Sequence, residues 1–360
     1  FLDINKFSMN IIKICNALLV ILVMCVTQQA SAQSDSISSC VSCMCAKDAT
    51  PAGSMISHVH PKGEWMFSYR FMYMNSKGMQ QNGNSISNTQ IFNNYLYTSD
   101  RMQMGMHMLM AMYGVNKNLT LMGMLEYNQA TMNMKGLPGS SHMHNGVMMS
   151  GDMSHDMKTS GFGDMSLTAL YSLLNNNKHH LLLSAGMSIP TGSIHNRGEA
   201  GSMYPDKRYP YMMQQGSGTW DVLPGLTYTF RGDKFMASTQ ATSILRTGYN
   251  SVGYKLGNKF VSNSWIAYQW FSFMSTSVRA EFIQLGKIKG SDPSYSAYTE
   301  PSANKVNYGG SSGFIYAGVN FYFLSINKIG LEFGLPVYQK TNGIQPTSYA
   351  NANLVYTIIF

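Results

Sequence analysis

The chain of 360 residues has a net charge of +8, yet only 12% of its residues are charged and 12% are aromatic. Its Lys and Arg residues form no cluster, so the charge does not indicate a nucleic-acid-binding surface, and we expect no nucleic-acid partner. Beyond residue 30 no apolar run reaches the roughly 18 residues of a membrane helix, which excludes a helical membrane protein. The composition instead suits a β-wall with one apolar and one polar face.

The first predicted element is an export signal over residues 1–32. Lys13 supplies its positive charge, residues 14–26 supply its apolar region, and the small residues ending at Ala32 form a cleavage site. Met9 is expected to be the true start of the chain. The mature protein is therefore predicted to be exported.

Residues 33–62 are predicted to form a periplasmic N-terminal segment that contains Cys40, Cys43 and Cys45. An odd number of cysteines so close together cannot form disulfides that cross-link distant parts of a fold. The motif is either a soft-metal clamp or part of a disordered tail with one exchanging disulfide. A polar linker over 46–61 follows it. This linker adds three further candidate ligands: Met55, His58 and His60.

From residue 63 to 360 the chain alternates with the period of two expected for β-strands. In residues 64–75 aromatic side chains occupy one face, from Trp65 to Tyr73, whereas Arg70 lies on the other. An Arg that faces lipid mid-membrane costs about 2–4 kcal/mol. The aromatic face is therefore predicted to contact lipid.

The most regular pattern lies in residues 101–113, where six methionines fall on every second position. In a strand, all six side chains project from one face. We name this set, Met102, Met104, Met106, Met108, Met110 and Met112, the Met ladder. Of the 30 Met in the chain, 20 lie between Met66 and Met165, so the enrichment is local.

The Met ladder can face either the lumen or the lipid. The next strand, residues 119–128, places Glu126 on its Met face, which favours an inward orientation. The opposite face of the ladder strand carries Arg101, Gln103 and His107, which favour the reverse. Leu109 shares that opposite face and suits lipid, and the costs of placing polar groups in lipid favour inward methionines over the reverse.

Connections of two lengths alternate along the chain, as in outer-membrane barrels with short periplasmic turns and long external loops. Short turns are expected at 114–118, 175–178, 231–234, 269–272 and 325–328, and long loops at 76–100, 135–160, 190–218, 248–256, 286–310 and 339–347. The final segment alternates apolar residues up to a terminal Phe360, which resembles the assembly signal of bacterial outer-membrane barrels. We predict an all-β fold: an antiparallel transmembrane barrel of about 12 strands, located in the outer membrane of a Gram-negative bacterium.

Three short motifs accumulate in the middle of the chain: Gly161-Phe162-Gly163-Asp164, Pro190-Thr191-Gly192 and Gly216-Ser217-Gly218-Thr219-Trp220-Asp221. Their order resembles the outer-membrane family named after the meta-pathway of phenol degradation, whose members are described as transporters. The resemblance covers residues 113–360 and implies a barrel and a transport role, with no catalytic residues. The Met and His enrichment departs from the family pattern.

Thioether sulfur is a soft ligand that suits Cu(I), and imidazole suits Cu(II). Met side chains on neighbouring strands, together with a His/Met-rich external loop, predict copper ligands along the barrel axis. The candidate metal ligands are Met72, Met74, Met102, Met104, Met106, Met108, Met110, Met112, Met122 and Met124 in the lumen; His142, Met143, His144, Met153, His155 and Met157 on the loop; and Cys40, Cys43 and Cys45 before the barrel.

Three functions follow from these patterns. The first is an outer-membrane channel that binds and passes copper through many weak, exchangeable sites, with a periplasmic metal carrier as a partner. The second is a passive or hydrophobic-solute transporter of the phenol-degradation type, in which Met only fills space. The third is a surface barrel that sequesters copper. No resident cofactor is required, and no Ser/His/Asp set or nucleotide-binding loop indicates an enzyme.

Overall fold

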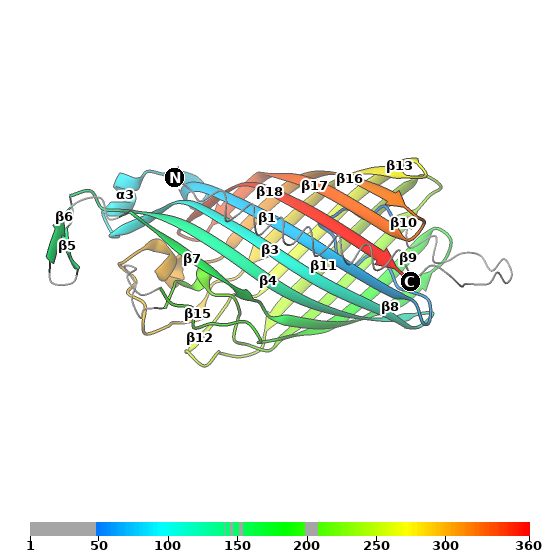
Figure 1. Cartoon of the computed structure of the whole chain (residues 1–360), viewed down its shortest axis with the longest axis horizontal. Helices are drawn as coiled ribbons and strands as arrows, with labels where there is room; N and C mark the ends of the chain where they lie inside the picture. The colour runs from blue at the N-terminus through cyan, green and yellow to red at the C-terminus, as the bar shows by residue number, and fades with distance from the viewer. Residues whose placement is uncertain (1–47, 140, 145–146, 151–153, 199–207) are drawn as a thin grey trace. The chain divides into compact units, whose positions relative to one another are not determined.

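The structure is a computed structural model that describes residues 48–139, 141–144, 147–150, 154–198 and 208–360. Its dominant element is one antiparallel barrel (Figure 1). The wall strands are β1 (Trp65–Gln81), β3 (Tyr97–Asn116), β4 (Leu119–Gly136), β7 (His155–Phe162), β8 (Met165–Asn175), β9 (His179–Ile189), β10 (Asp221–Arg231), β11 (Phe235–Arg246), β13 (Lys259–Phe271), β14 (Met274–Leu285), β16 (Gly310–Phe323), β17 (Asn327–Thr341) and β18 (Ile344–Ile359).

The barrel closes where β18 pairs with β1, from Met66 opposite Ile359 to Gln81 opposite Ile344. Strands β7 and β8 pair with successive parts of β4 and therefore share one position in the wall. The wall then has twelve antiparallel positions, as the sequence predicted. Closure matters because lipid offers no hydrogen-bond partner to an open strand edge.

The outer face of the wall is apolar. Large aliphatic side chains remain exposed on it, such as Leu109, Val278 and Leu335. Aromatic rings gather near the short turns, where Phe271 stacks on Phe273 and Trp65 stacks on Phe67. An apolar band bordered by aromatic rings is the surface of an outer-membrane barrel, so the predicted lipid face and location are confirmed.

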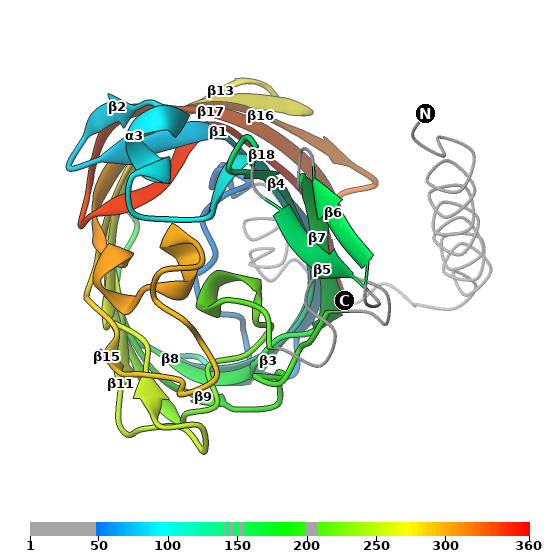
Figure 2. The same ribbon diagram turned by 90° about the vertical axis from the view of Figure 1, so that its left-hand side faces the viewer.

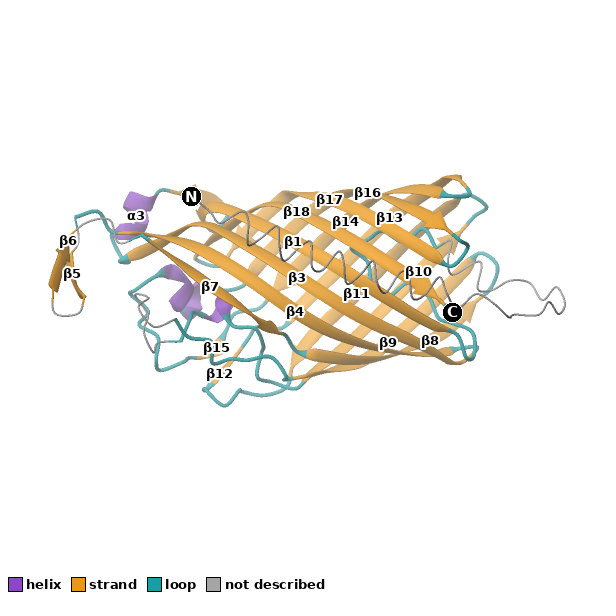
Figure 3. Cartoon of the chain, viewed as in Figure 1, coloured by secondary structure: helices purple, strands orange, loops and turns teal. Residues whose placement is uncertain are grey.

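The two ends of the barrel differ, as Figure 3 shows. Five tight turns connect strands at one end, between residues 116 and 119, 175 and 179, 231 and 235, 271 and 274, and 323 and 327. Longer connections fill the other end and carry the small elements β2 (Asn84–Ile86), α3 (Asn88–Phe92), β5 (Ser141–His144), β6 (Val147–Ser150), η1 (Tyr211–Met213), β12 (Tyr254–Lys255), β15 (Lys289–Gly290), η2 (Pro301–Ala303) and η3 (Lys305–Asn307). None of the helices in the described part has the length and apolar character to cross a bilayer.

Two sequence-based expectations about segment boundaries are wrong. The long loop expected over 76–100 is shorter, because β1 continues to Gln81 and β3 begins at Tyr97. The external loop expected over 135–160 also ends earlier, because β7 begins at His155 and pairs with β4. Strands β1, β3 and β7 extend past the apolar band because their backbone hydrogen bonds continue into the loop region. The residues there are polar, so no apolar alternation indicated a strand.

A charge on the outer face of β3 tests the orientation of the wall. We expect Leu109→Arg to lower the free energy of unfolding in lipid vesicles by about 2–4 kcal/mol, because the guanidinium would face acyl chains. Leu109→Met, which keeps an apolar side chain of similar volume, is the control and should cost less than about 1.5 kcal/mol. Equal stability of the two variants would contradict the lipid-facing position.

Candidate functional site: the barrel lumen

The Met ladder on β3 faces the lumen. Met108 and Met112 are 2% and 1% exposed, whereas Leu109 between them is 58% exposed. Methionines also line the inner faces of the neighbouring strands β1 and β4, so that the side chains form rows across three strands. From the short-turn end, the rows are Met66–Met112–Met122, Ser68–Met110–Met124, Arg70–Met108–Glu126, Met72–Met106–Asn128, Met74–Met104–Ala130 and Ser76–Met102–Met132.

The polar residues on the outer face of β3 have local partners, which removes the argument for the reverse orientation. The Nδ1 atom of His107 lies 2.8 Å from the hydroxyl of Tyr69, and its ring centroid lies 4.8 Å from that of Phe71. Gln103 donates a hydrogen bond of 2.7 Å to the hydroxyl of Tyr73. The prediction of inward methionines is therefore confirmed.

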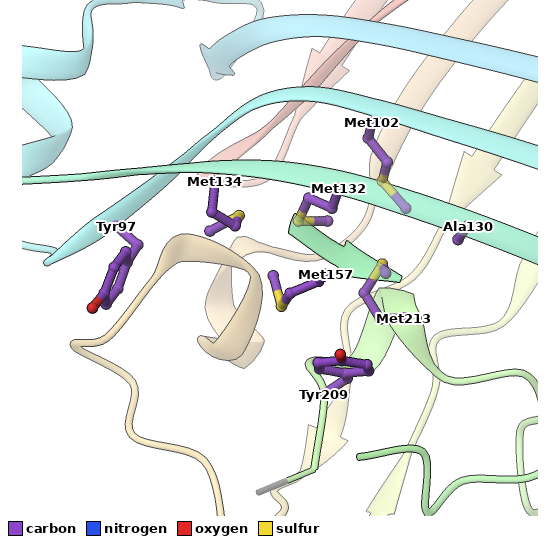
Figure 4. Close-up of a cluster of buried hydrophobic side chains, with 8 residues drawn as sticks. All are labelled: Tyr97, Met102, Ala130, Met132, Met134, Met157, Tyr209 and Met213. Carbon is purple, nitrogen blue, oxygen red and sulfur yellow. The ribbon is translucent and has the colours of Figure 1, made fainter. Parts of the chain in front are cut away.

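The outer end of the ladder packs into a closed apolar cluster, which we name the outer closure. It joins wall residues to a loop that folds inward between β9 and β10, and Figure 4 shows the thioethers of both parts side by side. None of its members is charged. The outer closure consists of Tyr97, Met102, Ala130, Met132, Met134, Met157, Tyr209 and Met213.

A second group of rings lies beside the outer closure. Tyr211 on η1 packs against three other tyrosines from the loops after β11 and β14, with Met212 contacting both groups. Burial raises the pKa of the Tyr211 phenol, and it raises the pKa of Tyr254 to about 12. These phenols are therefore uncharged at neutral pH, and the outer mouth of the barrel carries no charge from them.

The inner half of the lumen holds the first described residues of the chain, 48–60, which we name the lumen segment. In Figure 2 this segment, in blue, lies inside the ring of strands. Its contacts come from all sides of the wall: Arg70 on β1 donates to the Ser54 carbonyl, Gln240 on β11 to that of Ile56, and Asn320 on β16 to that of Thr50. These bonds span the barrel, so the segment crosses the lumen. The sequence suggested only a polar linker here, but its carbonyls pair with inward polar side chains.

Charges fix the start of the lumen segment. The Asp48 carboxylate accepts hydrogen bonds of 2.8 Å from the hydroxyls of Thr50 and Ser57, and Lys328 donates to the Asp48 carbonyl at 2.9 Å. Burial alone would raise the pKa of Asp48, but the hydrogen bond from His58 and the charges of Arg231, His58 and Lys328 hold it well below its usual value. Asp48 is therefore ionised and stabilises the docked segment at neutral pH.

Between the outer closure and the lumen segment, the inward methionines are not fully buried. Met72, Met74, Met104 and Met106 are half-buried although they point inward. Because their side chains face away from lipid, this exposure is toward the lumen. At the inner end, Ile56 and Val59 of the lumen segment pack against the lowest row of methionines. On the side formed by β1, β3 and β4, the lumen is thus lined by thioethers in the middle, and it is covered at both ends.

The three glycine-rich motifs meet at one point on the wall, where β7 passes into β8. The Asp164 carboxylate accepts backbone hydrogen bonds from Gly192 at 3.0 Å and from Ser217 at 2.9 Å. A Cβ atom on Gly192 would lie 2.6 Å from the Cα atom of Gly216, so this approach of two backbones requires glycine. The motifs therefore fasten the inward loop to the wall.

A family profile described as the MetA-pathway of phenol degradation matches residues 81–321, which is more than half of the chain and includes all three motifs. The chain belongs to this family. The resemblance inferred from the motifs is thereby confirmed.

This member of the phenol-degradation family has the fold of a solved outer-membrane channel. It is similar to an outer-membrane channel from Pseudomonas putida F1, with a TM-score of 0.57 and 16% identity over 86% of this chain and 98% of that one. The transport unit of the autotransporter AIDA-I from Escherichia coli gives a TM-score of 0.44 and 11% identity, covering 88% and 97%. The CymD monoaromatic hydrocarbon channel gives 0.36 and 10%, covering 84% and 89%. Among proteins with curated descriptions, no relative was found.

The structure places the predicted metal ligands in two groups. All ten lumen methionines lie on the inner faces of β1, β3 and β4, and Met157 joins the outer closure. The ring of His155 contacts Tyr97 at 5.2 Å between centroids. The signal peptide, Cys40, Cys43, Cys45 and Met153, and the side chains of His142, Met143 and His144, lie outside the described residues.

Within the described part, no three His, Cys, Asp or Glu side chains are close enough together to hold a metal ion. A soft-metal site there would have to use thioethers. The assignment of these residues as metal ligands stays a prediction.

Sequence reasoning missed the lumen segment and the loop tyrosines. The segment's large apolar residues, Met55, Ile56 and Val59, are too few to indicate packing. The only sequence signal for the loop is the run Tyr209-Pro210-Tyr211-Met212-Met213, in which large apolar side chains fall in an external loop.

The docking of the lumen segment can be tested at Gly53. A Cβ atom there would lie 2.1 Å from Nη2 of Arg279, which is itself held by Glu332 at 2.8 Å. We expect Gly53→Val to prevent docking, so that added protease cleaves the lumen segment of the folded barrel in detergent severalfold faster than in the wild type. Met55→Leu, a volume-conserving change in the same segment, should leave the cleavage rate unchanged. Equal cleavage of both variants and the wild type would show that the segment is not held in the lumen.

Proposed function

We propose that this protein is an outer-membrane channel for small, uncharged hydrophobic solutes, aromatic ones included. The observation that carries the proposal is the composition of the outer closure. Five Met, two Tyr and one Ala meet there without a charged group. Water-filled porins have polar interiors, whereas sites for apolar ligands are lined by apolar and aromatic side chains.

Two further features support the proposal. The chain belongs to a family named for the degradation of phenol, an aromatic compound. The Met side chains between the closures are unbranched and adaptable, so they can contact apolar solutes of different shapes. Transport would then require that the outer closure and the lumen segment both move, because each covers one end of the thioether-lined lumen.

Uptake of an apolar solute by intact cells tests this function, since lipopolysaccharide slows such solutes more than a plain bilayer does. We expect Gram-negative cells that contain the protein to take up radiolabelled naphthalene faster than cells without it. Met132→Lys should reduce that uptake about tenfold, because it places a charge in the fully buried centre of the outer closure. Met132→Leu keeps an apolar side chain and should retain at least half of the uptake.

Equal amounts of folded protein, measured by heat-dependent mobility in gels, are the control for both variants. Uptake that is independent of the protein would contradict the proposal. Swelling of proteoliposomes in arabinose, without any effect on naphthalene, would instead identify a porin for polar solutes.

Copper is the second candidate cargo, and the inward Met ladder is the observation that favours it. Six ladder thioethers and their cross-strand neighbours offer many soft ligands in one lumen. Such sites suit Cu(I), and weak, multiple sites are what conduction requires. Passage of copper would use a metal carrier in the periplasm as a partner, and binding without passage would make the barrel a copper store.

Replacement of all six ladder methionines by Leu separates the two cargoes. Leu preserves volume and apolar character but removes the sulfur ligand, so naphthalene uptake should stay within about twofold. If copper is a cargo, titration with Ag(I), a redox-stable substitute for Cu(I), should show at least tenfold weaker binding to this variant than to the wild type. Equal Ag(I) affinities would end the copper hypothesis. Copper flux into proteoliposomes then distinguishes a channel from a store.

A further inference from the structure

Tyr211 sits in a cage made of three other tyrosine rings. Its ring centroid lies 4.8 Å from that of Tyr254, 4.7 Å from that of Tyr295 and 5.4 Å from that of Tyr308. The interplanar angles are 80°, 86° and 83°, so all three contacts are edge-to-face. This is the preferred arrangement of aromatic pairs, here repeated three times around one ring. We name Tyr254, Tyr295 and Tyr308 the tyrosine cage.

The cage also recognises the hydroxyl group of the ring that it holds. The Tyr211 hydroxyl accepts a hydrogen bond of 3.1 Å from the backbone N–H of Asp292. Asp292 is held in place by an ion pair between its carboxylate and Arg208, with a distance of 2.9 Å to Nε. The occupied position therefore provides an apolar cavity for one ring and a fixed donor for one oxygen, which together match the chemistry of a phenol.

The walls of the cage are anchored partly through groups outside it. The Tyr308 hydroxyl donates a hydrogen bond of 2.7 Å to the Ser302 carbonyl. Tyr254 belongs to β12, which pairs with β15 through Gly290. Two walls also bond to the loop of the occupant, since the Tyr295 hydroxyl donates to the Tyr209 carbonyl and the Met212 N–H donates to the Tyr308 hydroxyl at 3.3 Å. The loops after β11 and β14 thus supply all three walls, and Tyr254 and Tyr308 keep anchors of their own when η1 moves.

The occupant, in contrast, comes from a different loop and from a short element. Tyr211 is the first residue of η1, which has three residues and no side-chain cap. Its neighbours Tyr209 and Met213 belong to the outer closure. A ring that leaves the cage would therefore disturb the outer closure at the same time.

We infer that the tyrosine cage is a binding site for a single phenol-like ring, and that Tyr211 occupies it as a tethered substitute in the closed channel. The inference rests on the proposed function and names its substrate class. A phenol that enters the cage competes with Tyr211, and the displaced turn η1 opens the outer closure. Because a tethered ring acts at an effective concentration of about millimolar or more, the wild-type protein binds free phenol weakly.

Removal of the tethered ring tests the inference in the full-length mature protein in detergent, with phenol as the probe. By isothermal titration, Tyr211→Ala should bind phenol at least tenfold more tightly than the wild type, because three aromatic contacts become available. Tyr211→Phe keeps the ring and should bind as weakly as the wild type. Tyr211→Ala combined with Tyr308→Leu removes one wall of the cage and should lose most of the gain.

Cyclohexanol is the matched control ligand, since it has the same hydroxyl and a similar size without an aromatic ring. It should bind Tyr211→Ala at least threefold more weakly than phenol does. Tyr211→Leu is a second enlarging variant, should the cage collapse around Ala. Phenol binding that is unchanged in both Ala and Leu variants, or equal for cyclohexanol, would overturn the inference.

The phenol titration and the naphthalene uptake assay test separate claims, so either claim can fail without the other. Naphthalene uptake without phenol binding by the enlarged cage would leave the proposed channel intact and refute the cage. Phenol binding by the cage without any uptake of naphthalene would support the cage and contradict the proposed channel.

Discussion

The structure depends on the absence of hydrogen-bond partners in lipid. Every backbone N–H and C=O in the apolar band must pair within the wall, and only a closed sheet achieves this with strands. The pairing of β18 with β1 completes that closure. Once the wall is closed, each strand has one face toward lipid and one toward the lumen, and the alternation along the sequence assigns every side chain to one of them.

That assignment explains why chemistry gathers on the inner face. Arg70 lies in one row with Met108 and Glu126, and Arg279 forms an ion pair with Glu332. Charged groups of this kind would be costly in lipid, but in the lumen they hold the lumen segment and each other. The methionines of β3 share this inner face. Their position is a consequence of strand period, and they give one side of a lumen that also holds charged groups a row of soft sulfur atoms.

The architecture could be predicted from the sequence because the two-residue period and the loop lengths both reflect the same lipid constraint. Arg70 and Glu126 favoured an inward Met ladder, whereas Arg101 and His107 on the opposite face of its strand kept the reverse orientation open. The docking of the lumen segment and the packing of the loop tyrosines could not be predicted in this way. Residues 48–60 bind the wall mainly through their carbonyls, which every sequence possesses, and the contact of Tyr211 with Tyr254, Tyr295 and Tyr308 joins loops far apart in the chain.

The position of the lumen segment in the chain has a consequence for biogenesis. The segment immediately precedes β1, and β1 forms one edge of the final seam with β18. Strand β1, which closes the barrel by pairing with β18, is therefore joined to the lumen segment by only a few residues. A newly assembled molecule carries its own obstruction into the outer membrane and does not pass through a stage in which a separate subunit must find an open hole.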